Sequence, residues 1–200
     1  MSGLPWLNNS LWFPNPEIAL NEPEGLLCAG GDLSVERLTE AYKRGIFPWY
    51  SQDQPILWWS PNPRCVLEFS NLHISKSMRR TLNNPELSYS FDTQFRRVIE
   101  GCAAPREYSS ETWILDEMVE AYCKLHDQNI AHSIEVWRSG KLTGGLYGIS
   151  LGRCFFGESM YGLEPNISKY AFIKLALSLQ AWGCELFDCQ LPNSHLTSLG

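Results

Sequence analysis

Two apolar segments of the sequence each carry an acidic residue among aromatic and aliphatic neighbours. The segment CFFGESMYG contains Glu158, and the segment CELFDCQL contains Asp188 with Gln190 two residues later. Moving an unpaired carboxylate out of water costs several kcal/mol, so each acid must be paired, protonated or turned toward water. In an extended strand, Asp188 and Gln190 would point to one side at a spacing of about 7 Å. Such a pair can orient an amine or hydrogen-bond a leaving group, which predicts a site for a cation or a nucleophilic amine.

The same patterns also fit structural roles. Period-two alternation places Phe156 and Met160 on the same strand face as Glu158. A structural salt bridge at a strand end would explain Glu158 equally well. An edge strand with polar residues facing solvent would explain Asp188 and Gln190. The strand pattern therefore leaves a functional and a structural interpretation open.

Other reactive residue types give weaker indications. Cys123 and His126 could form a cysteine–histidine pair, but their i, i+3 spacing is also that of neighbours on one helix face. The sequence has 7 cysteines and no C-x-x-C pair, a pattern typical of reduced thiols. The histidines are dispersed, and no G-x-S-x-G, P-loop or G-x-G-x-x-G motif occurs. We therefore expect no metal ion and no cofactor. The absence of these motifs excludes the serine hydrolase, NTPase and dinucleotide-binding classes.

The charge pattern limits how a polyanion could bind. With 16 Lys and Arg against 22 Asp and Glu, the net charge is −6, so the average surface repels nucleic acid. Lys76, Arg79 and Arg80 nevertheless lie at i, i+3 and i+4, which places them on one face of a predicted helix. Arg96 and Arg97 form a second basic pair. A local basic patch for nucleic acid and a solvated helix face both fit this pattern.

Tryptophans are concentrated in a segment rich in proline. Trp49, Trp58 and Trp59 belong to IFPWYSQDQPILWWSPNPR, and Trp113 is a further candidate of the same kind. Aromatic side chains held rigid in this way stack well on bases. They form small hydrophobic cores more often. The segment therefore predicts a base-stacking platform, with core packing as the alternative.

The elements that must position these residues fall into two regions. Residues 1–62 are rich in Pro, Gly and Trp and contain one predicted helix, which Ser34 caps and Gly45 ends. This composition predicts a small, loop-rich N-terminal domain. The sequence Pro61-Asn62-Pro63 favours an extended linker. We therefore predict a second domain at residues 63–200.

From residue 64 the hydrophobic pattern alternates between strands and helices. Strands are predicted at 64–69, 131–140, 141–152, 153–162 and 184–191, and helices at 75–84, 91–103, 116–129 and 167–182. Hairpin turns are predicted at Ser139-Gly140 and Leu151-Gly152, a helix cap at Asn166, and a core position at Trp182. Three antiparallel strands followed by a helix and a further strand predict an α+β fold with a mixed, mostly antiparallel sheet flanked by helices.

The bulk composition is that of a globular protein outside membranes. Hydrophobic residues make up 44% of the sequence and charged residues 19%. No apolar run reaches the ~18 residues of a membrane span, and the first residues lack the pattern of a signal peptide. We expect a cytoplasmic monomer that does not enter a membrane.

Several longer motifs resemble those of one known family. In order, they are FPNPEIALNEPEGLLCAGGDLSVERLTEAYKRGIFPWYS, PILWWSPNPR, HISKSMRR, TWI, AHSIEVW, GGLYGISLG, FFGESMYG, NISK, FDCQ and HLTSLG. They extend from Phe13 to Gly200 and closely resemble the leucyl/phenylalanyl-tRNA–protein transferases. The resemblance implies an enzyme that moves Leu or Phe, and less readily Met, from aminoacyl-tRNA to the α-amine of proteins beginning with Arg or Lys, marking them for regulated degradation. It also implies a larger domain with a GNAT-like acyltransferase fold.

The resemblance also implies roles for individual residues. Asp188 and Gln190 match a pair associated with catalysis, and Glu158 matches an acid that holds the incoming basic N-terminus or its amine. The positions that match the apolar aminoacyl pocket are Leu146, Phe155, Met160, Phe172, Leu175 and Phe187. The positions that match contacts with the terminal adenosine are Tyr42, Trp49 and Trp113, and those for the tRNA acceptor arm are Lys76, Arg79 and Arg80.

The sequence departs from the family pattern in three places. Ile167 stands where Ala is usual, and Glu111 stands where Gly is usual. Family members also generally continue beyond HLTSLG into a further helix, so we expect lower stability or weaker activity if such a helix caps the sheet.

Two other classes of function remain as alternatives. An acetyl-CoA-dependent acetyltransferase would need a Gly-rich loop for pyrophosphate before the long helix, where this sequence has Glu164 and Pro165. A non-catalytic tRNA- or peptide-binding module would keep the tryptophans and the basic cluster but would not need Asp188 and Gln190.

Overall fold

The computed structural model describes residues 3–105 and 113–200, so Glu111 lies outside the described residues. The chain forms two compact units: Met1–Pro63 with Pro105–Lys124, and Arg64–Ala104 with Leu125–Gly200. The helix α4 (Asp116–Asp127) spans the division between residues 124 and 125. The division of the chain into domains at 1–62 and 63–200 stays a prediction.

The first unit contains a small sheet and a capped helix. Its four-stranded sheet has the order β1-β2-β4-β3. The elements are β1 (Trp6–Leu7), the 3-10 helix η1 (Pro16–Ile18), β2 (Leu26–Gly30), α1 (Val35–Tyr42), β3 (Phe47–Pro48) and β4 (Leu57–Trp59). As predicted, the Ser34 side chain caps α1 by accepting from the Arg37 amide, and Gly45 adopts a φ of +71° just beyond the helix.

The second unit is built on a six-stranded sheet with the order β5-β10-β9-β8-β7-β6. Adjacent strands are antiparallel except β9 and β10, which are parallel. The strands are β5 (Cys65–Leu67), β6 (Leu87–Phe91), β7 (Ala131–Arg138), β8 (Lys141–Leu151), β9 (Cys154–Gly162) and β10 (Leu186–Gln190). The helical segments are η2 (Phe69–Asn71), α2 (Lys76–Leu82), α3 (Phe95–Ala103), α5 (Ile167–Ala181) and α6 (Ser194–Thr197). The predicted α+β class, with a mixed and mostly antiparallel sheet, is confirmed.

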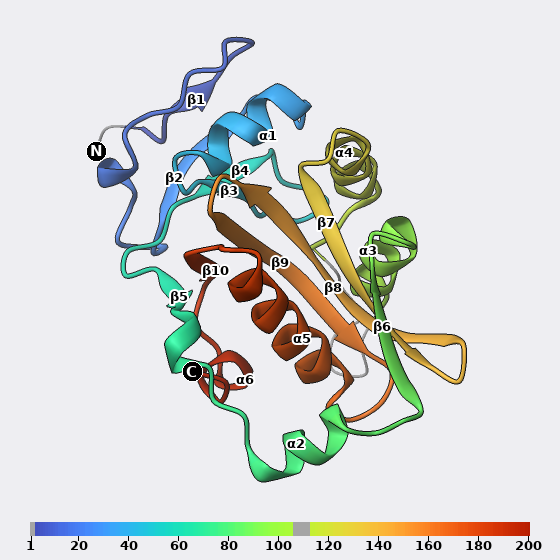
Figure 1. The fold of residues 1–200 in the computed structure, drawn as a ribbon. Coiled ribbons are helices and arrows are strands. Elements are labelled where there is room, and N and C mark those ends of the chain that lie inside the picture. The colour runs from blue at the N-terminus through green and yellow to red at the C-terminus, as the bar shows by residue number, and fades with distance from the viewer. Residues whose placement is uncertain (1–2, 106–112) are drawn as a thin grey trace. The chain divides into compact units, whose positions relative to one another are not determined.

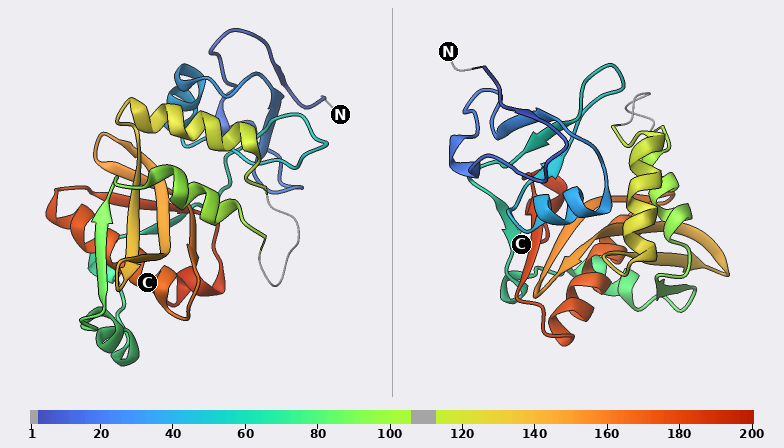
Figure 2. Two further views of the ribbon diagram at one scale, coloured as in Figure 1. Left: turned by 90° about the vertical axis from the view of Figure 1, so that its right-hand side faces the viewer. Right: turned by 90° about the horizontal axis from the view of Figure 1, so that it is seen from above.

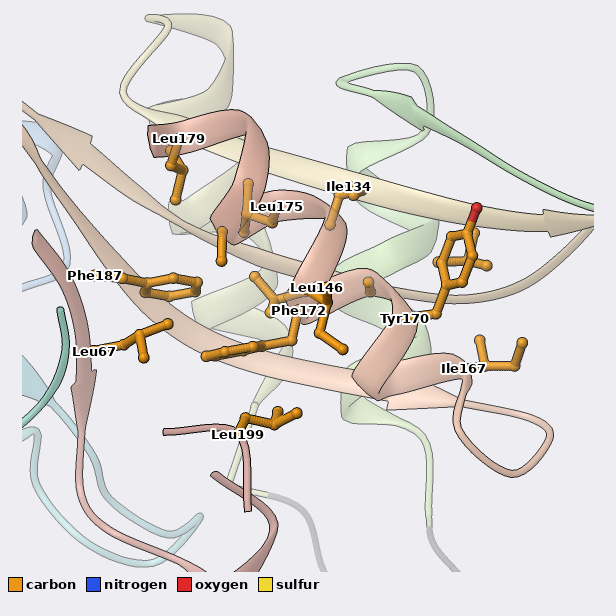
Figure 3. Close-up of a cluster of buried hydrophobic side chains, with 14 of the residues drawn as sticks. Leu67, Ile134, Leu146, Ile167, Tyr170, Phe172, Leu175, Leu179, Phe187 and Leu199 are labelled. Carbon is orange, nitrogen blue, oxygen red and sulfur yellow. The ribbon is translucent and has the colours of Figure 1, made fainter. Parts of the chain in front are cut away.

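Helices α3 and α5 cover opposite faces of this sheet (Figures 1 and 2). On the α3 side, the Phe95 ring lies edge-on to Tyr147 of β8 at 5.9 Å. On the α5 side, a buried cluster joins the helix to the strands (Figure 3). Ile167, at the start of α5, is fully buried and lies where a Cβ on Gly144 or Gly162 would clash. Ile167, which is larger than the alanine usual at this position, therefore fills space beside two glycines.

Several predictions about individual elements are wrong. Trp182 is 63% exposed and lies edge-on to Phe91, because it follows the last turn of α5 and leaves the core face. Asn166 occupies the cap position with a φ of 69°, but its side chain makes no capping hydrogen bond. The predicted helix at 91–103 begins at Phe95, since Phe91 still belongs to β6 at the sheet edge and residues 92–94 form the bend between strand and helix. The second hairpin turn lies at Gly152–Arg153, one residue later than predicted.

In the part of the chain that the structure describes, no helix has the length and apolar character needed to cross a membrane.

Candidate active site

The side chains of Asp188, Gln190 and Glu158 belong to one hydrogen-bonded network in the second unit. The Gln190 Nε2 donates to Glu158 Oε1 at 2.6 Å, and the Gln190 backbone N–H donates to Asp188 Oδ1 at 2.8 Å. Arg64 completes the network, because its Nε lies 2.9 Å from Asp188 Oδ1 and 3.0 Å from Oδ2. Asp188 is 4% exposed and Gln190 is 8% exposed. A buried carboxylate and a buried amide are thus satisfied by each other and by one arginine.

Irregular strand geometry brings these groups together. The register of β8 against β9 shifts between Gly157 and Ser159, so Glu158 is the extra residue of a β-bulge. On the parallel neighbour β10, the register against β5 shifts between Asp188 and Gln190, and Gln190 has a φ of 62°. A bulge turns a side chain away from simple alternation. The two bulges allow Glu158 and Gln190 to meet across adjacent strands.

The bulge at Glu158 corrects the predicted alternation along β9. Met160 packs against the cluster that contains Phe155, whereas Phe156 lies outside that cluster. Phe156 and Met160 therefore lie on different faces of β9, so they are not both same-face companions of Glu158 as a regular strand would make them. After one inserted residue, each following side chain points to the opposite face of the sheet from the one that regular alternation predicts.

The residues predicted for the apolar pocket form one cluster beneath α5. Their side chains come from the sheet and the helix, and Figure 3 shows four of them, Leu146, Phe172, Leu175 and Phe187, pointing into a shared space. The Phe187 ring stacks on Phe172 at 4.8 Å and lies edge-on to Phe155 at 5.4 Å. Met160 is only partly buried at the margin of the cluster. Phe187 and Asp188 are consecutive in β10, so the apolar cluster and the polar network lie on opposite faces of the same strand.

Thiols near Asp188 are held in the neutral form. Burial, and next the Asp188 charge, raises the pKa of Cys154 to about 11. Burial, together with Cys65 and Asp188, raises the pKa of Cys189 to about 12. A thiol is a weak nucleophile compared with its thiolate. Around neutral pH these cysteines are therefore poor nucleophiles, and the polar groups at hand for chemistry are Asp188, Gln190 and Glu158.

The aromatic candidates of the first unit differ in exposure. Trp49 is 40% exposed and tilted against Trp59 at 5.3 Å, and the Trp59 indole N–H donates to the Trp49 carbonyl at 2.6 Å. Trp58 is fully buried against Phe13, so this tryptophan belongs to the core. Trp113 is partly buried. Among these tryptophans, Trp49 presents a supported aromatic surface to solvent.

Tyr42, the other aromatic candidate of the first unit, is buried. It is 1% exposed, and its hydroxyl hydrogen-bonds the hydroxyl of Tyr122. In this structure its ring belongs to the interior of the first unit.

The basic candidates share the outer face of α2 in the second unit. Lys76, Arg79 and Arg80 are exposed, whereas Met78 between them is buried. Ser75 caps this helix by accepting from the Met78 amide at 3.2 Å. The i, i+3, i+4 spacing therefore produces one exposed basic face, as predicted.

Two family models match the chain. The model described as leucyl/phenylalanyl-tRNA protein transferase matches residues 66–200, and the model of the N-terminal domain of that transferase matches residues 31–62. The chain belongs to this family. It is accordingly an enzyme, and the predicted family is confirmed.

Curated relatives agree along the whole chain. A leucyl/phenylalanyl-tRNA–protein transferase from Hahella chejuensis is 61% identical over 200 residues, which cover 100% of this chain and 86% of the relative. The transferase from Pseudomonas putida (strain W619) is 55% identical over 198 residues, covering 98% of this chain and 88% of the relative. Among solved structures, an aminoglycoside acetyltransferase from a soil metagenome aligns with a TM-score of 0.41 at 12% identity, covering 54% of this chain and 81% of that one.

Arg64 was not predicted as a site residue. It belongs to the motif LWWSPNPR and directly precedes β5. Pairing the strand at 64–69 with the strand at 184–191 would have brought Arg64 near Asp188, but nothing in the local sequence indicates that pairing. The roles of the predicted transferase residues stay predictions, and the geometry of the network gives them a physical basis.

Proposed function

We propose that the protein transfers Leu or Phe, and less readily Met, from aminoacyl-tRNA to the α-amine of proteins that begin with Arg or Lys, marking them for regulated degradation. The observation that carries this proposal is the contact of Gln190 Nε2 with Glu158 Oε1 at 2.6 Å, beside the buried Asp188. This arrangement supplies acceptor atoms for a cationic or amine-bearing substrate on one face of β10, and the large apolar cluster lies on the other face of the same strand.

The reaction needs positioning and proton transfer from the attacking amine. The aminoacyl ester is already activated, so the amine nitrogen attacks the ester carbonyl, a C–N bond forms and the ester C–O bond breaks. The amine loses one proton, and the departing ribose oxygen gains one. An α-amine has a pKa of about 8, so much of it is protonated near neutral pH and must lose a further proton before attack. An acceptor atom near the amine can bind the ammonium form and then take or relay that proton.

The network suggests separate roles for its members. Gln190 Nε2 is engaged by Glu158, which leaves the amide oxygen of Gln190 as the group able to accept from the incoming amine. Glu158 supplies the negative charge that attracts the basic N-terminal residue. Asp188 accepts from Arg64 and from the Gln190 amide, so we assign it to orienting Gln190 and stabilising positive charge nearby.

Each part of the donor has its own candidate residues. The apolar cluster of Leu146, Phe155, Met160, Phe172, Leu175 and Phe187 would accept the Leu or Phe side chain. Each buried methylene contributes about 0.8 kcal/mol, which favours large apolar residues. Trp49 and Trp113 would contact the terminal adenosine, and the basic face of α2 would contact the acceptor arm. Tyr42 is 1% exposed, so its ring is not available to stack on the adenosine in this structure.

The site of action follows from the substrates. Aminoacyl-tRNA is made and used where translation occurs, so we propose that the protein acts in the cytoplasm. We also propose that it acts as a monomer.

The test uses the intact protein with labelled Leu-tRNA and two peptides that differ only in beginning with Arg or Gly. We expect RNase-sensitive transfer to the Arg peptide and little to the Gly peptide. Glu158→Gln removes the charge but keeps the shape, and should raise KM for the Arg peptide about 10-fold, or about 1.4 kcal/mol, with unchanged affinity for Leu-tRNA. Absence of transfer by folded wild-type protein would refute the function. An unchanged KM in Glu158→Gln would refute the role of that carboxylate.

A further inference from the structure

Arg64 makes the contact that fixes the buried carboxylate of the candidate site. Its Nε is shared between Asp188 Oδ1 at 2.9 Å and Oδ2 at 3.0 Å. The Arg64 side chain is 19% exposed and that of Asp188 is 6% exposed. An ion pair that is this well shielded from water is screened far less than a surface pair, so loss of one partner leaves a buried charge uncompensated.

We infer that Arg64 is a positioning residue for aminoacyl transfer, acting on Gln190 through Asp188. The inference rests on the proposed function. Asp188 Oδ1 receives the Gln190 backbone N–H at 2.8 Å as well as the Arg64 Nε. The same carboxylate oxygen therefore links the arginine to the residue whose side chain meets Glu158.

The backbone of Gln190 explains why such a link is needed. Gln190 has a φ of 62°, a conformation that costs a residue with a Cβ about 1–2 kcal/mol. It also follows the register shift between Asp188 and Gln190, where the ladder with β5 is interrupted. The hydrogen bond from its N–H to Asp188 helps to hold this conformation. If Asp188 rotated, the Gln190 amide would lose its fixed direction toward Glu158 and the acceptor amine.

Arg64 is well placed to control that rotation. It directly precedes β5, and β5 pairs with β10 through Val66 opposite Asp188. The arginine therefore reaches the carboxylate from the start of the neighbouring strand, beside the register shift in β10. A displacement of about 1 Å in a positioned group can lower a rate by about 100-fold.

The experiment compares Arg64→Met, Arg64→Lys and Arg64→Ala with wild type, using Leu-tRNA and an Arg-initiated peptide. Arg64→Met should lower kcat by about 100-fold, with KM for Leu-tRNA changed less than about two-fold. Arg64→Lys keeps the charge but not the planar geometry, and should recover only part of the loss. Added guanidinium ion at millimolar concentration should partly restore kcat to Arg64→Ala, since it can occupy the vacated space beside Asp188.

A double mutant separates positioning from general stability. Arg64→Met combined with Asp188→Ala should be no slower than Asp188→Ala alone, because both changes disrupt the same link. The matched control is Arg153→Met, which removes an exposed ion pair with Glu185 in the same unit and should keep wild-type kcat.

The outcomes are distinguishable. Inactive wild-type protein would refute the proposed function itself. An active wild type with unchanged kcat in Arg64→Met and Arg64→Lys would overturn the role of Arg64 alone. An equal loss of kcat and of Leu-tRNA affinity would make Arg64 a binding residue and would also overturn it. If Arg64→Met fails to fold, Arg64→Lys decides: a wild-type kcat there contradicts the inference, and a reduced kcat with unchanged KM supports it.

Discussion

Asp92 and His132 form a titrating pair in the second unit. His132 Nδ1 lies 2.8 Å from Asp92 Oδ2, and the Ser133 amide donates to Asp92 Oδ1 at 2.8 Å. The hydrogen bond with Asp92 raises the pKa of His132 above its usual 6.5, although burial opposes this. Burial acts to raise the pKa of Asp92, but hydrogen bonds from His132 and Ser133 lower it overall. Each group therefore favours the charged form of the other.

This pair predicts a pH-dependent part of the stability. A raised histidine pKa stabilises the folded state below pH 6.5, and the contribution disappears as the pH rises through the folded pKa. Because both side chains are about one-third exposed, we expect only about 0.5 kcal/mol between pH 5.5 and 8.5. Urea unfolding at the two pH values should show this difference in wild type and a smaller one in His132→Asn. An equal pH dependence in both proteins would contradict the assignment.

Glu135 shows a different way of burying a carboxylate. It is fully buried, and its oxygens accept hydrogen bonds from the hydroxyls of Ser90, Thr93 and Ser133 at 2.6–2.7 Å. Neutral donors therefore satisfy this acid, whereas Arg64 pairs with Asp188. The contrast shows that an acid within an apolar strand is not sufficient evidence for catalysis; its partners decide its role.

At the scale of elements, glycines in β8 allow unusually close packing. A Cβ on Gly148 would lie 2.2 Å from the Phe156 carbonyl oxygen and 2.5 Å from the Phe155 ring. A Cβ on Gly145 would meet the Ile134 carbonyl at 2.7 Å and Val98 of α3 at 2.9 Å. At these two glycines, the groups that pack on opposite faces of β8 therefore approach its backbone closely. Gly148 also lies opposite Gly157, next to the bulge at Glu158.

We therefore predict that Gly148→Ala damages both stability and activity. The new methyl group must displace backbone or a packed ring, so the free energy of unfolding should fall by about 2 kcal/mol. The strain falls beside Glu158, so kcat/KM for the Arg peptide should fall as well. Ser150→Ala, in the same strand, is the control and should change both quantities little. Wild-type stability in Gly148→Ala would show that this packing is looser than the distances indicate.

At the scale of the whole molecule, the distribution of charge matters more than its sum. The net charge is −6, yet Lys76, Arg79 and Arg80 are all exposed on one face of α2. Long-range repulsion from the acidic surface is screened beyond about 8–10 Å at ordinary salt concentrations. A local basic face can therefore bind phosphates despite the overall charge.

The salt dependence of tRNA binding tests whether this basic face binds phosphates. Changing Lys76, Arg79 and Arg80 to Gln should weaken tRNA binding and reduce the slope of log K against log salt by about 0.9 for each phosphate that the variant no longer neutralises. Arg96→Gln with Arg97→Gln on α3 is the control and should leave the slope close to that of wild type. Filter binding or fluorescence titration across a range of salt concentrations gives both slopes. Equal reductions in the two variants would argue against a specific role for α2.

The sequence by itself determined the family, the α+β class and most of the helices and strands. Periodicity was sufficient for the basic face of α2, because helical spacing fixes which side chains are neighbours. The capped start of α1 was likewise a local property of Ser34 and the residues that follow it. Long shared motifs identified the family without any knowledge of the tertiary structure.

Only the tertiary structure decided how the polar residues meet. Alternation along single strands placed Phe156 with Glu158 and gave Asp188 and Gln190 a simple shared face, but bulges in β9 and β10 changed both relations. Local sequence does not reveal a bulge, because it depends on the register with the partner strand. Arg64 was missed for the same reason, since it meets Asp188 across 124 positions of sequence. The isolated acids of the two apolar segments therefore became one network only when strand pairing joined them.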